Sequence, residues 1–321
     1  MAEFSHNPVL LREVLQFLSL EETRGSNGGI VRLFDGTLGG AGHASEMMRQ
    51  FAPNGILYGC DRDGEELERT RVRLETEFAG RCHLKHGNYS QVDELFPDVK
   101  FDVALMDLGC SSMQLDRTER GFSFQGDAPL DMRMDRSQGV RAEDVVNGYS
   151  AEELADLFYY FGGERESRRL ARAIVEERML RRFVSTRQLA DFIEARMPRN
   201  GKRIHPATRV FQALRIEVNR EFDHLEIALD KVLRALKVGG RMAIITFHSG
   251  EDKIVKDFGR KWARDYDFDG EVDVPELRHY RDPVFKILTR KPVEATAAEV
   301  EANPRARSAR LRVFEKVSEL L

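Results

Sequence analysis

Hydrophobic residues in the N-terminal third of the chain form short continuous runs instead of alternating with polar residues. Continuous runs of this length are typical of strands buried inside a parallel sheet. Three of them lead directly into an aspartate: 30–34 before Asp35, 56–60 before Asp61 and 101–106 before Asp107. The first run is followed by a glycine-rich segment, 36–42, and then by a helix-compatible stretch, 44–51. This order is the pattern of a nucleotide-binding half-fold, with glycines where the backbone passes close to a ligand.

The three aspartates indicate which ligand this sheet binds. The carboxyl ends of parallel strands meet at one edge of a sheet, so we expect the three carboxylates together. A carboxylate directly before the glycine turn would be an unfavourable neighbour for the pyrophosphate of a nicotinamide cofactor. S-adenosylmethionine has no phosphate, and a carboxylate attracts its ammonium and sulfonium groups. Asp35 therefore favours the methyl donor, and Asp61 is suited to accept hydrogen bonds from both ribose hydroxyls.

Four more strands are predicted along the chain, at 82–85, 241–247, 283–289 and 309–317. Hydrophobic residues recur at helical spacing over 217–236, and Gly239-Gly240 is expected to end that helix. Another helix is expected over 251–264. The sequence thus predicts seven strands, with four before a long break in the αβ alternation and three after it.

The break itself has helical patterns and no strand signal. Helices are expected at 151–161, 167–182 and 186–196, the last with Ser185 as its N-cap. We therefore predict an α/β fold with a Rossmann-like, seven-stranded, mostly parallel sheet and an inserted all-helical domain. The predicted domains are a discontinuous sheet domain, 1–114 and 216–321, and a helical domain, 115–215. A helical insertion at the carboxyl edge of the sheet is suited to hold a substrate over a cofactor.

Composition excludes several classes of protein. Hydrophobic residues make up 41% of the chain and charged residues 32%, which is typical of a globular protein. No apolar stretch approaches the ~18 residues of a membrane helix, and no secretory signal is visible, so a cytoplasmic protein is expected. The three cysteines, Cys60, Cys82 and Cys110, fit neither a zinc pattern nor a disulfide framework. We expect small buried hydrophobic side chains there and predict no metal site.

The net charge of −4 conceals a basic block. Residues 165–215 contain 14 lysines and arginines against 5 acidic residues, which leaves the rest of the chain strongly acidic. Such a block indicates a surface for a polyanion, nucleic acid first. Arginine-rich helices are also often solvated faces with internal ion pairs, and the residues alone leave both interpretations open.

Segments punctuated by glycine or proline lie at the predicted strand ends and in the insertion. They are 107–116 (DLGCSSMQLD), 120–124 (RGFSF), 129–135 (PLDMRMD), 205–215 (HPATRVFQALR), 246–252 (TFHSGED) and 303–308 (NPRARS), with HNPVLL at 6–11. In this order, over nearly the whole chain, they resemble the RsmH (MraW) family of bacterial rRNA methyltransferases.

The resemblance implies a specific reaction. Members transfer a methyl group from S-adenosylmethionine to the exocyclic N4 of a cytidine in the decoding region of 16S rRNA. Their fold is a Rossmann-like class I methyltransferase domain interrupted by a helical domain that helps to recognise RNA. The implied cofactor contacts fall on Ala41, Gly42, His43, Asp61, Tyr89, Asp107 and Gln114. The implied partner is 16S rRNA, as naked RNA or within the small ribosomal subunit, and the sequence contains no signal for oligomeric state.

Asp107 is the candidate for catalysis. The lone pair of the cytosine amine is delocalised into the ring, and a carboxylate that accepts one N4 hydrogen can orient the amine and favour its attack. Many amine methyltransferases have two prolines and an aromatic after this acidic residue, whereas Asp107 is followed by Leu-Gly-Cys-Ser-Ser. Asp107 as a cofactor ligand alone therefore stays an alternative. His205 and His248 are possible proton acceptors, although structural hydrogen bonds are the favoured interpretation of both.

The sequence departs from the family pattern at several positions. Met113 replaces a proline before Gln114, Cys110 replaces a common valine, and Gly250 occupies a position that is usually leucine. In the insertion, Gly163 and Glu166 replace a glutamate and an aromatic residue. The first change weakens the Gln114 assignment, and the last two put fine RNA contacts in doubt.

Three other functions are weighed against this one. The chain could methylate another nucleic acid or a protein amine, or it could be a non-catalytic RNA-binding assembly factor that kept the fold. A nicotinamide oxidoreductase is disfavoured by Asp35 and by the lack of a residue pair for hydride transfer.

Overall fold

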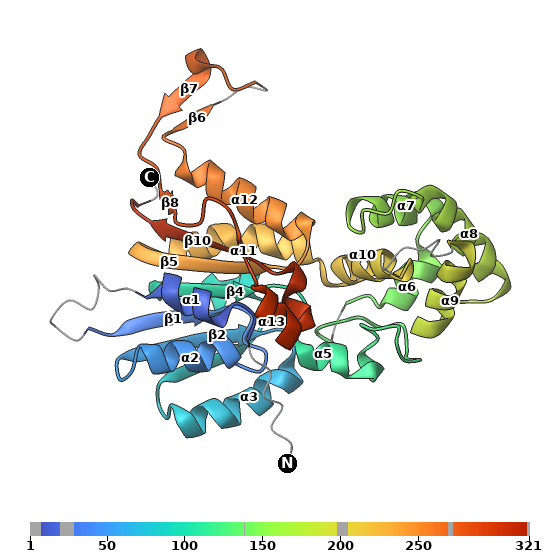
Figure 1. The fold of residues 1–321 in the computed structure, drawn as a ribbon, viewed down its shortest axis with the longest axis horizontal. Helices are drawn as coiled ribbons and strands as arrows, with labels where there is room; N and C mark the ends of the chain where they lie inside the picture. Colours follow the sequence, from blue (N-terminus) through green and yellow to red (C-terminus); the bar gives the residue numbers. More distant parts are fainter. Residues whose placement is uncertain (1–7, 20–28, 138, 198–204, 269–271, 320–321) are drawn as a thin grey trace. The chain divides into compact units, whose positions relative to one another are not determined.

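The computed structural model describes residues 8–19, 29–137, 139–197, 205–268 and 272–319 (Figure 1). The chain divides into two compact units. The sheet unit comprises residues 1–109 and 223–321, and the helical unit comprises residues 110–222. Within the described ranges, no helix is both long enough and apolar enough to cross a membrane.

The sheet unit contains one large sheet with the strand order β3-β2-β1-β4-β5-β10-β8. These strands are β1 (Val31–Asp35), β2 (Gly55–Asp61), β3 (Cys82–His86), β4 (Phe101–Asp107), β5 (Leu236–Thr246), β8 (Phe285–Ile287) and β10 (Arg310–Lys316). All pairings from β3 to β5 are parallel, whereas β10 runs antiparallel to both β5 and β8. The predicted seven-stranded, mostly parallel α/β sheet is confirmed, and a two-residue strand, β9 (Val293–Glu294), adds an eighth beside β10.

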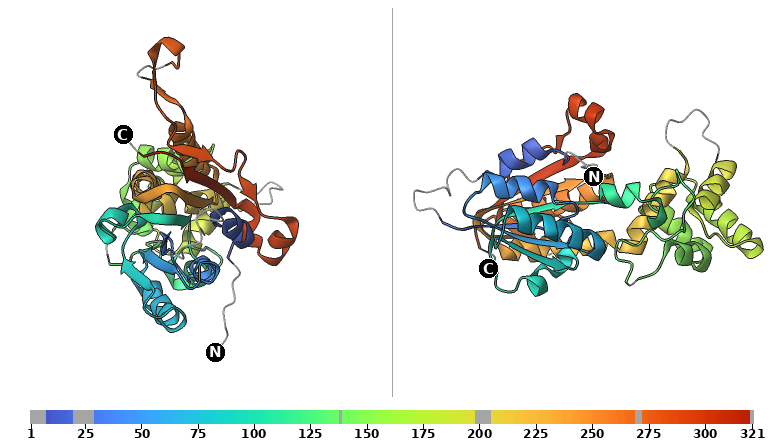
Figure 2. Two further views of the ribbon diagram at one scale, coloured as in Figure 1. Left: turned by 90° about the vertical axis from the view of Figure 1, so that its left-hand side faces the viewer. Right: turned by 90° about the horizontal axis from the view of Figure 1, so that it is seen from below.

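Helices cover both faces of the large sheet, because successive side chains of a strand point to opposite faces (Figures 1 and 2). On β1, Leu33 packs with the helices α1 (Leu11–Leu18), α2 (Gly42–Gln50) and α3 (Gly64–Glu77). The next residue, Phe34, packs with α4 (Val92–Leu95), α11 (Glu221–Ala235) and α12 (Ser249–Ala263). Strands covered on both faces have continuous apolar sequences, as the sequence showed.

The remaining elements of the sheet unit are short. They are α13 (Ala297–Ala302), the 3₁₀ helices η1 (Tyr89–Gln91), η3 (Pro275–Leu277) and η4 (Pro304–Ser308), and a separate two-stranded sheet of β6 (Tyr266–Phe268) and β7 (Arg278–Tyr280). All three cysteines are free. Cys60 is buried, but Cys82 and Cys110 are only half-buried, because each lies at the start or beyond the end of a strand.

The helical unit has its own hydrophobic core. Its helices are α5 (Ser112–Asp116), η2 (Thr118–Arg120), α6 (Ala142–Gly148), α7 (Ala151–Tyr160), α8 (Ser167–Leu180), α9 (Thr186–Arg196) and α10 (Ala207–Asn219). The predicted helices at 151–161, 167–182 and 186–196 are confirmed within two residues. Ser185 caps α9 as expected, since its side chain accepts a hydrogen bond from the N–H of Gln188 at 3.3 Å.

The predicted single helix over 217–236 is wrong. Arg220 adopts the left-handed conformation at φ 48° and separates α10 from α11. Tertiary contacts override the helical pattern: the buried side chain of Asn219 accepts from the N–H of Met134 and donates to the carbonyl of Met132, both at 2.8 Å. The helix also does not end at Gly239-Gly240, which lie inside β5.

Candidate active site

The candidate site lies at the carboxyl edge of the sheet, where β1 has β2 on one side and β4 on the other. The order of the strands reverses at β1, and ligands of open α/β sheets bind at such a point. Asp35, Asp61 and Asp107 are the last residues of these three neighbouring strands. The structure therefore brings together the carboxylates that the sequence placed at one edge.

The loop after β1 connects the three strand ends through hydrogen bonds. The N–H of Thr37 donates to Oδ1 of Asp35 at 3.0 Å, and its hydroxyl accepts from the N–H of Asp107 at 2.7 Å. The N–H of Gly39 donates to Oδ2 of Asp61 at 2.7 Å. These bonds fix the glycine-rich loop against the carboxylates of Asp35 and Asp61 and against the backbone of Asp107.

The start of α2 is shaped by backbone conformation and close packing. Ala41, the residue before the helix, has a left-handed φ of 53°, which is uncommon for a residue with a Cβ and is found most often at functional sites. Gly42 lies against Pro8, so that a Cβ added there would be 2.6 Å from Cγ of that proline. The N-terminal motif therefore packs on the first turn of α2, although its residues His6 and Asn7 lie outside the described ranges.

The three carboxylates all have raised pKa values. Burial raises the pKa of Asp35 to about 7. Hydrogen bonds from Thr37 lower this pKa, and the nearby charge of Asp61 raises it by a smaller amount. Burial also raises the pKa of Asp61, although the N–H groups of Asp63 and Gly39 oppose that shift.

Burial raises the pKa of Asp107 well above its usual range, and the carboxylates of Asp35 and Glu251 add to the shift. His43, in the first turn of α2, is the ring next to it, with Nδ1 3.6 Å from Oδ2 of Asp107. Nε2 of the same ring is 2.9 Å from the carbonyl oxygen of Val9. Burial lowers the pKa of His43 to about 4.

Tyr89 approaches the same edge from the segment after β3. It begins η1, whose N-cap Asn88 accepts a hydrogen bond from the N–H of Ser90 at 3.0 Å. A Cβ added to Gly36 would be 2.9 Å from Cβ of Tyr89, so only glycine allows the two segments to meet this closely.

Gln114 belongs to the helical unit. It is buried in the first turn of α5, where its side chain accepts from the N–H of Ser111 at 3.1 Å and its own N–H donates to the Ser111 hydroxyl at 3.2 Å. This reciprocal pair is a capping box, a role that the motif around Gln114 did not predict.

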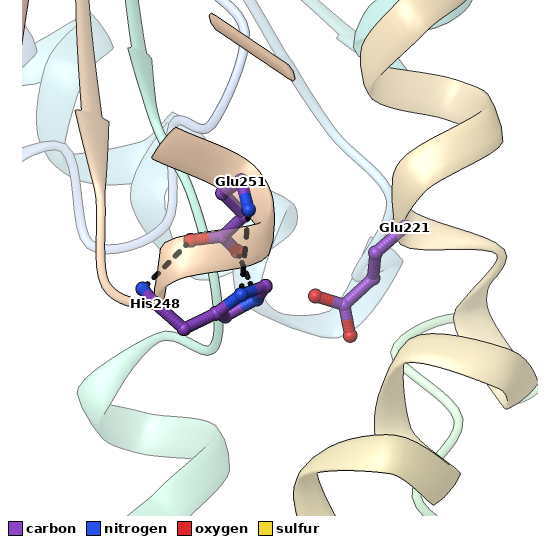
Figure 3. Close-up of side chains that lie close together, drawn as sticks. All are labelled: Glu221, His248 and Glu251. Carbon is purple, nitrogen blue, oxygen red and sulfur yellow. Dashed lines mark hydrogen bonds and ion pairs between the residues drawn. The ribbon is translucent and has the colours of Figure 1, made fainter. Parts of the chain in front are cut away.

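The two histidines considered as proton acceptors both make structural hydrogen bonds, as favoured. Figure 3 shows His248 and Glu251 at the start of α12. The N–H of Phe247 donates to Oε2 of Glu251 at 2.8 Å, and the N–H of Glu251 donates to Nδ1 of His248 at 3.4 Å. In the helical unit, Nδ1 of His205 accepts from the N–H of Ala207 at 3.1 Å.

Other motif residues hold the fold together. In the sheet unit, Asp252 forms a buried two-point ion pair with Arg312 of β10, at 2.7 and 3.1 Å. In the helical unit, Arg120 donates to the carbonyls of Arg133 and Met134 at 3.0 and 2.8 Å. The motifs TFHSGED, RGFSF and PLDMRMD therefore contain architectural residues that motif spacing alone did not distinguish from functional ones.

The three carboxylates at the strand ends fit S-adenosylmethionine. Across the described part of the chain, no lysine or arginine forms an ion pair with Asp35, Asp61 or Asp107. Oδ1 of Asp107 is buried, and no described residue donates a hydrogen bond to it. A ligand with positive charge and hydroxyl donors would stabilise such a group of carboxylates.

Comparison with known proteins identifies the family. The model of the MraW methylase family matches residues 3–317. The chain belongs to this family. It is 45% identical to the ribosomal RNA small subunit methyltransferase H of Syntrophotalea carbinolica, over 98% of each chain. It is 47% identical to the protein of the same name from Citrifermentans bemidjiense, over 99% of this chain and 100% of that one.

Membership confirms the family that the motifs resemble. The chain is an S-adenosylmethionine-dependent methyltransferase with a Rossmann-like class I fold, as predicted. The nicotinamide alternative is thereby excluded.

Proposed function

We propose that this methyltransferase transfers the methyl group of S-adenosylmethionine to the exocyclic N4 of a cytidine in the decoding region of 16S rRNA. The observation on which this depends most is the group of three carboxylates at the β1–β4 switch point, one buried and two half-buried, since it fits a cationic methyl donor. The names of relatives at 45% and 47% identity support small-subunit rRNA as the acceptor. Such a substrate would place the reaction in the cytoplasm.

The proposed cofactor contacts follow from the residues at the strand ends. Ala41, Gly42 and His43 would approach the methionine end through the backbone, because the N–H groups of a first helical turn have no partner within the helix. Asp61 would accept the ribose hydroxyls. Tyr89 would lie against the adenine.

Asp107 is the residue that we assign to the acceptor amine. S-adenosylmethionine supplies an electrophilic methyl group, and the amine must lose a proton when it accepts that group. The carboxyl group of Asp107, whose side chain is 27% exposed and whose Oδ1 has no donor among the described residues, is suited to accept one N4 hydrogen. The assignment of Gln114 to the cofactor depends on the resemblance alone, because its side chain already caps α5.

We assign rRNA phosphates to the helical unit. Five arginines of the basic block are exposed: Arg168, Arg169, Arg172, Arg181 and Arg182. Arg169 forms an ion pair with Glu166, and Arg182 lies 3.8 Å from Glu143. The other three form no ion pair with a described residue and are the best placed to bind phosphates through two-point contacts.

Charge reversal tests the phosphate contacts. Arg168→Glu combined with Arg172→Glu should weaken binding to 16S rRNA at least about tenfold, because each lost contact also reduces the release of counterions. The slope of the logarithm of the binding constant against the logarithm of the salt concentration should become less steep by about two. Arg12→Glu with Arg260→Glu, two exposed arginines of the sheet unit, gives the same change in net charge as a control. Equal losses for both pairs would show a general charge effect and contradict the assignment.

Methyl transfer from labelled S-adenosylmethionine tests the function. The acceptors are 30S subunits from a strain without this gene and naked 16S rRNA from the same cells, and mass mapping identifies the product nucleoside. We expect one N4-methylcytidine in the decoding region, with assembled subunits as the better substrate because the target base must leave its stack in a fixed environment. Asp61→Ala should abolish it through loss of cofactor binding.

The same assay separates the alternatives. Methylation of another nucleoside or of a protein would assign another acceptor. Cofactor binding without transfer to any fraction of the cell would favour a different substrate, and no cofactor binding would favour a non-catalytic assembly factor.

A further inference from the structure

The ring of His43 has a defined tautomer. The residue is 6% exposed, and Nε2 lies 2.9 Å from the carbonyl oxygen of Val9. A carbonyl oxygen only accepts hydrogen bonds, so Nε2 must carry the hydrogen of the ring. In the neutral ring, Nδ1 then has a lone pair and no hydrogen.

That nitrogen faces a carboxyl group, since Nδ1 lies 3.6 Å from Oδ2 of Asp107. A lone pair and an ionised carboxylate would repel each other, so the arrangement is favourable only when the pair holds one additional proton. At 3.6 Å, slightly longer than a hydrogen bond, either Asp107 is a neutral acid whose hydrogen points toward Nδ1, or His43 is an imidazolium beside a carboxylate. The two forms contain the same number of protons.

The surroundings determine where this proton lies in the protein alone. Asp107 is faced by the carboxylates of Asp35 on β1 and Glu251 on α12, besides His43 on α2. Burial and these two charges raise the pKa of Asp107 well above its usual range. Burial lowers the pKa of His43 to about 4. Asp107 therefore holds the proton, and a neutral acid cannot take up a second one from an amine.

We propose that His43 is a positioning residue that receives this proton on Nδ1, and so leaves Asp107 as the carboxylate that accepts a proton from the substrate amine. The inference rests on the proposed function of the chain. Oδ2 of Asp107 exchanges the shared proton with His43, and no described residue donates a hydrogen bond to Oδ1, so no described donor stabilises the carboxylate once that proton has moved. Val9 fixes the ring for this exchange, because its carbonyl keeps the other hydrogen on Nε2.

The proton balance is complete with these groups. As the methyl group bonds to N4, the donor sulfur keeps the electron pair of the broken bond. N4 releases one proton to Asp107, while the shared proton is on His43. The pair then holds one proton more than before, and that proton leaves to water through Asp107, whose side chain is 27% exposed.

Nuclear magnetic resonance of ¹⁵N-histidine protein tests the shared proton without any reaction. The chain has eight histidines, and the His43 signals are those absent from His43→Gln. In the wild type without the methyl donor we expect the Nδ1 shift near its unprotonated limit, because Asp107 holds the proton, and it should move toward the protonated limit when S-adenosylmethionine is added without RNA. In Asp107→Asn it should stay near the unprotonated limit. Identical Nδ1 shifts in both proteins, with and without the methyl donor, would overturn the proposal.

A pH profile tests the consequence for catalysis. His43→Gln should lower kcat at pH 7 about tenfold or more, and the loss should shrink toward pH 9, because Asp107 can then lose its proton to water. His83→Gln, an exposed histidine on β3, is the matched control and should follow the wild type. A His43→Gln defect of the same factor at every pH would indicate a merely structural role and refute the proposal.

Cofactor binding and a substitute variant separate a loss of the shared proton from a loss of folding or of the proposed function. His43→Gln should bind S-adenosylhomocysteine within about threefold of the wild type, since the proposed contact of residue 43 is through its backbone. If that variant does not fold, His43→Asn replaces it. The Nδ1 shifts of the wild type and of Asp107→Asn still show whether the two residues share a proton. If the wild type methylates no cytidine, the proposed function fails, whereas the resonance experiment still tests the shared proton.

Discussion

Replacement of Asp35 by asparagine should stabilise the protein without its cofactor at neutral and alkaline pH. Asp35 is 2% exposed and forms no ion pair with a described residue. Asparagine has nearly the same shape and keeps an oxygen that can accept from the N–H of Thr37, now at 3.0 Å. The substitution therefore removes a buried negative charge and retains the local hydrogen bond.

The magnitude follows from the pKa of this group. Burial raises the pKa of Asp35 from 3.8 to about 7, so between these values the folded protein binds a proton that the unfolded chain does not. Stability then falls as pH rises through this window, by about 1.4 kcal/mol per pH unit, and levels off above about pH 7. From pH 5 to pH 8 the wild type should lose about 2–3 kcal/mol of unfolding free energy through this group.

Urea unfolding of the wild type and Asp35→Asn at pH 5, 6, 7 and 8 measures this effect. Other titrating groups contribute equally to both proteins, so they drop out of the difference in unfolding free energy. That difference should grow by about 2–3 kcal/mol in favour of the variant as pH rises. Asp257→Asn, at an exposed position of α12, is the control and should show no such trend. A difference that stays constant, or that shrinks toward high pH, would refute the assignment of a raised pKa to Asp35. With saturating S-adenosylmethionine the wild type should gain more stability than the variant, since only the wild type binds the cation with this charge.

Two further substitutions test the packing around the site. Gly42→Ala places a Cβ 2.6 Å from Cγ of Pro8, so it should cost about 1–3 kcal/mol of stability and weaken S-adenosylhomocysteine binding in calorimetry, whereas Gly40→Ala, with no atom within 4 Å of the added Cβ, should change neither. Unchanged binding by Gly42→Ala would show that Pro8 is free to move. Asp252→Asn leaves the buried charge of Arg312 without its partner and should cost about 3–5 kcal/mol in urea unfolding, and a loss below about 1 kcal/mol would contradict a structural role for this ion pair.

The strands at the centre of the sheet could be predicted from the sequence because burial on both faces imposes a continuous apolar run. β1, β2 and β4 end at Asp35, Asp61 and Asp107, and those aspartates with the glycine-rich turn placed the site at the carboxyl edge of the sheet. The short strands lacked such a signal. β6, β7 and β9 have two or three residues each, and none is covered on both faces.

The end of α10 shows why local patterns fail where tertiary contacts decide. Apolar spacing continues through Arg220 as if one helix ran on, and arginine favours a helix. Asn219, however, bonds with its side chain to the backbone of Met132 and Met134, about 85 residues earlier in the chain. No pattern within a helical window contains that information.

The same limit applies to the site. Sequence motifs assigned His43 to the cofactor, but the direction of its ring is set by Val9, 34 residues away, and by Asp107 on another strand. Likewise, the raised pKa values depend on how deeply the three strand ends are buried, which the motifs do not specify.

The arrangement of the carboxylates has a consequence for turnover. Thr37 holds the ends of β1 and β4 together by accepting from the N–H of Asp107 while donating to Asp35, so the two carboxyl groups stay close in the protein alone. Their repulsion and burial disfavour ionisation, and a bound cation offsets both effects. S-adenosylmethionine has a sulfonium charge that S-adenosylhomocysteine lacks. We therefore expect this site to bind the methyl donor in preference to the product that must leave, and Asp35→Asn should narrow that difference in affinity.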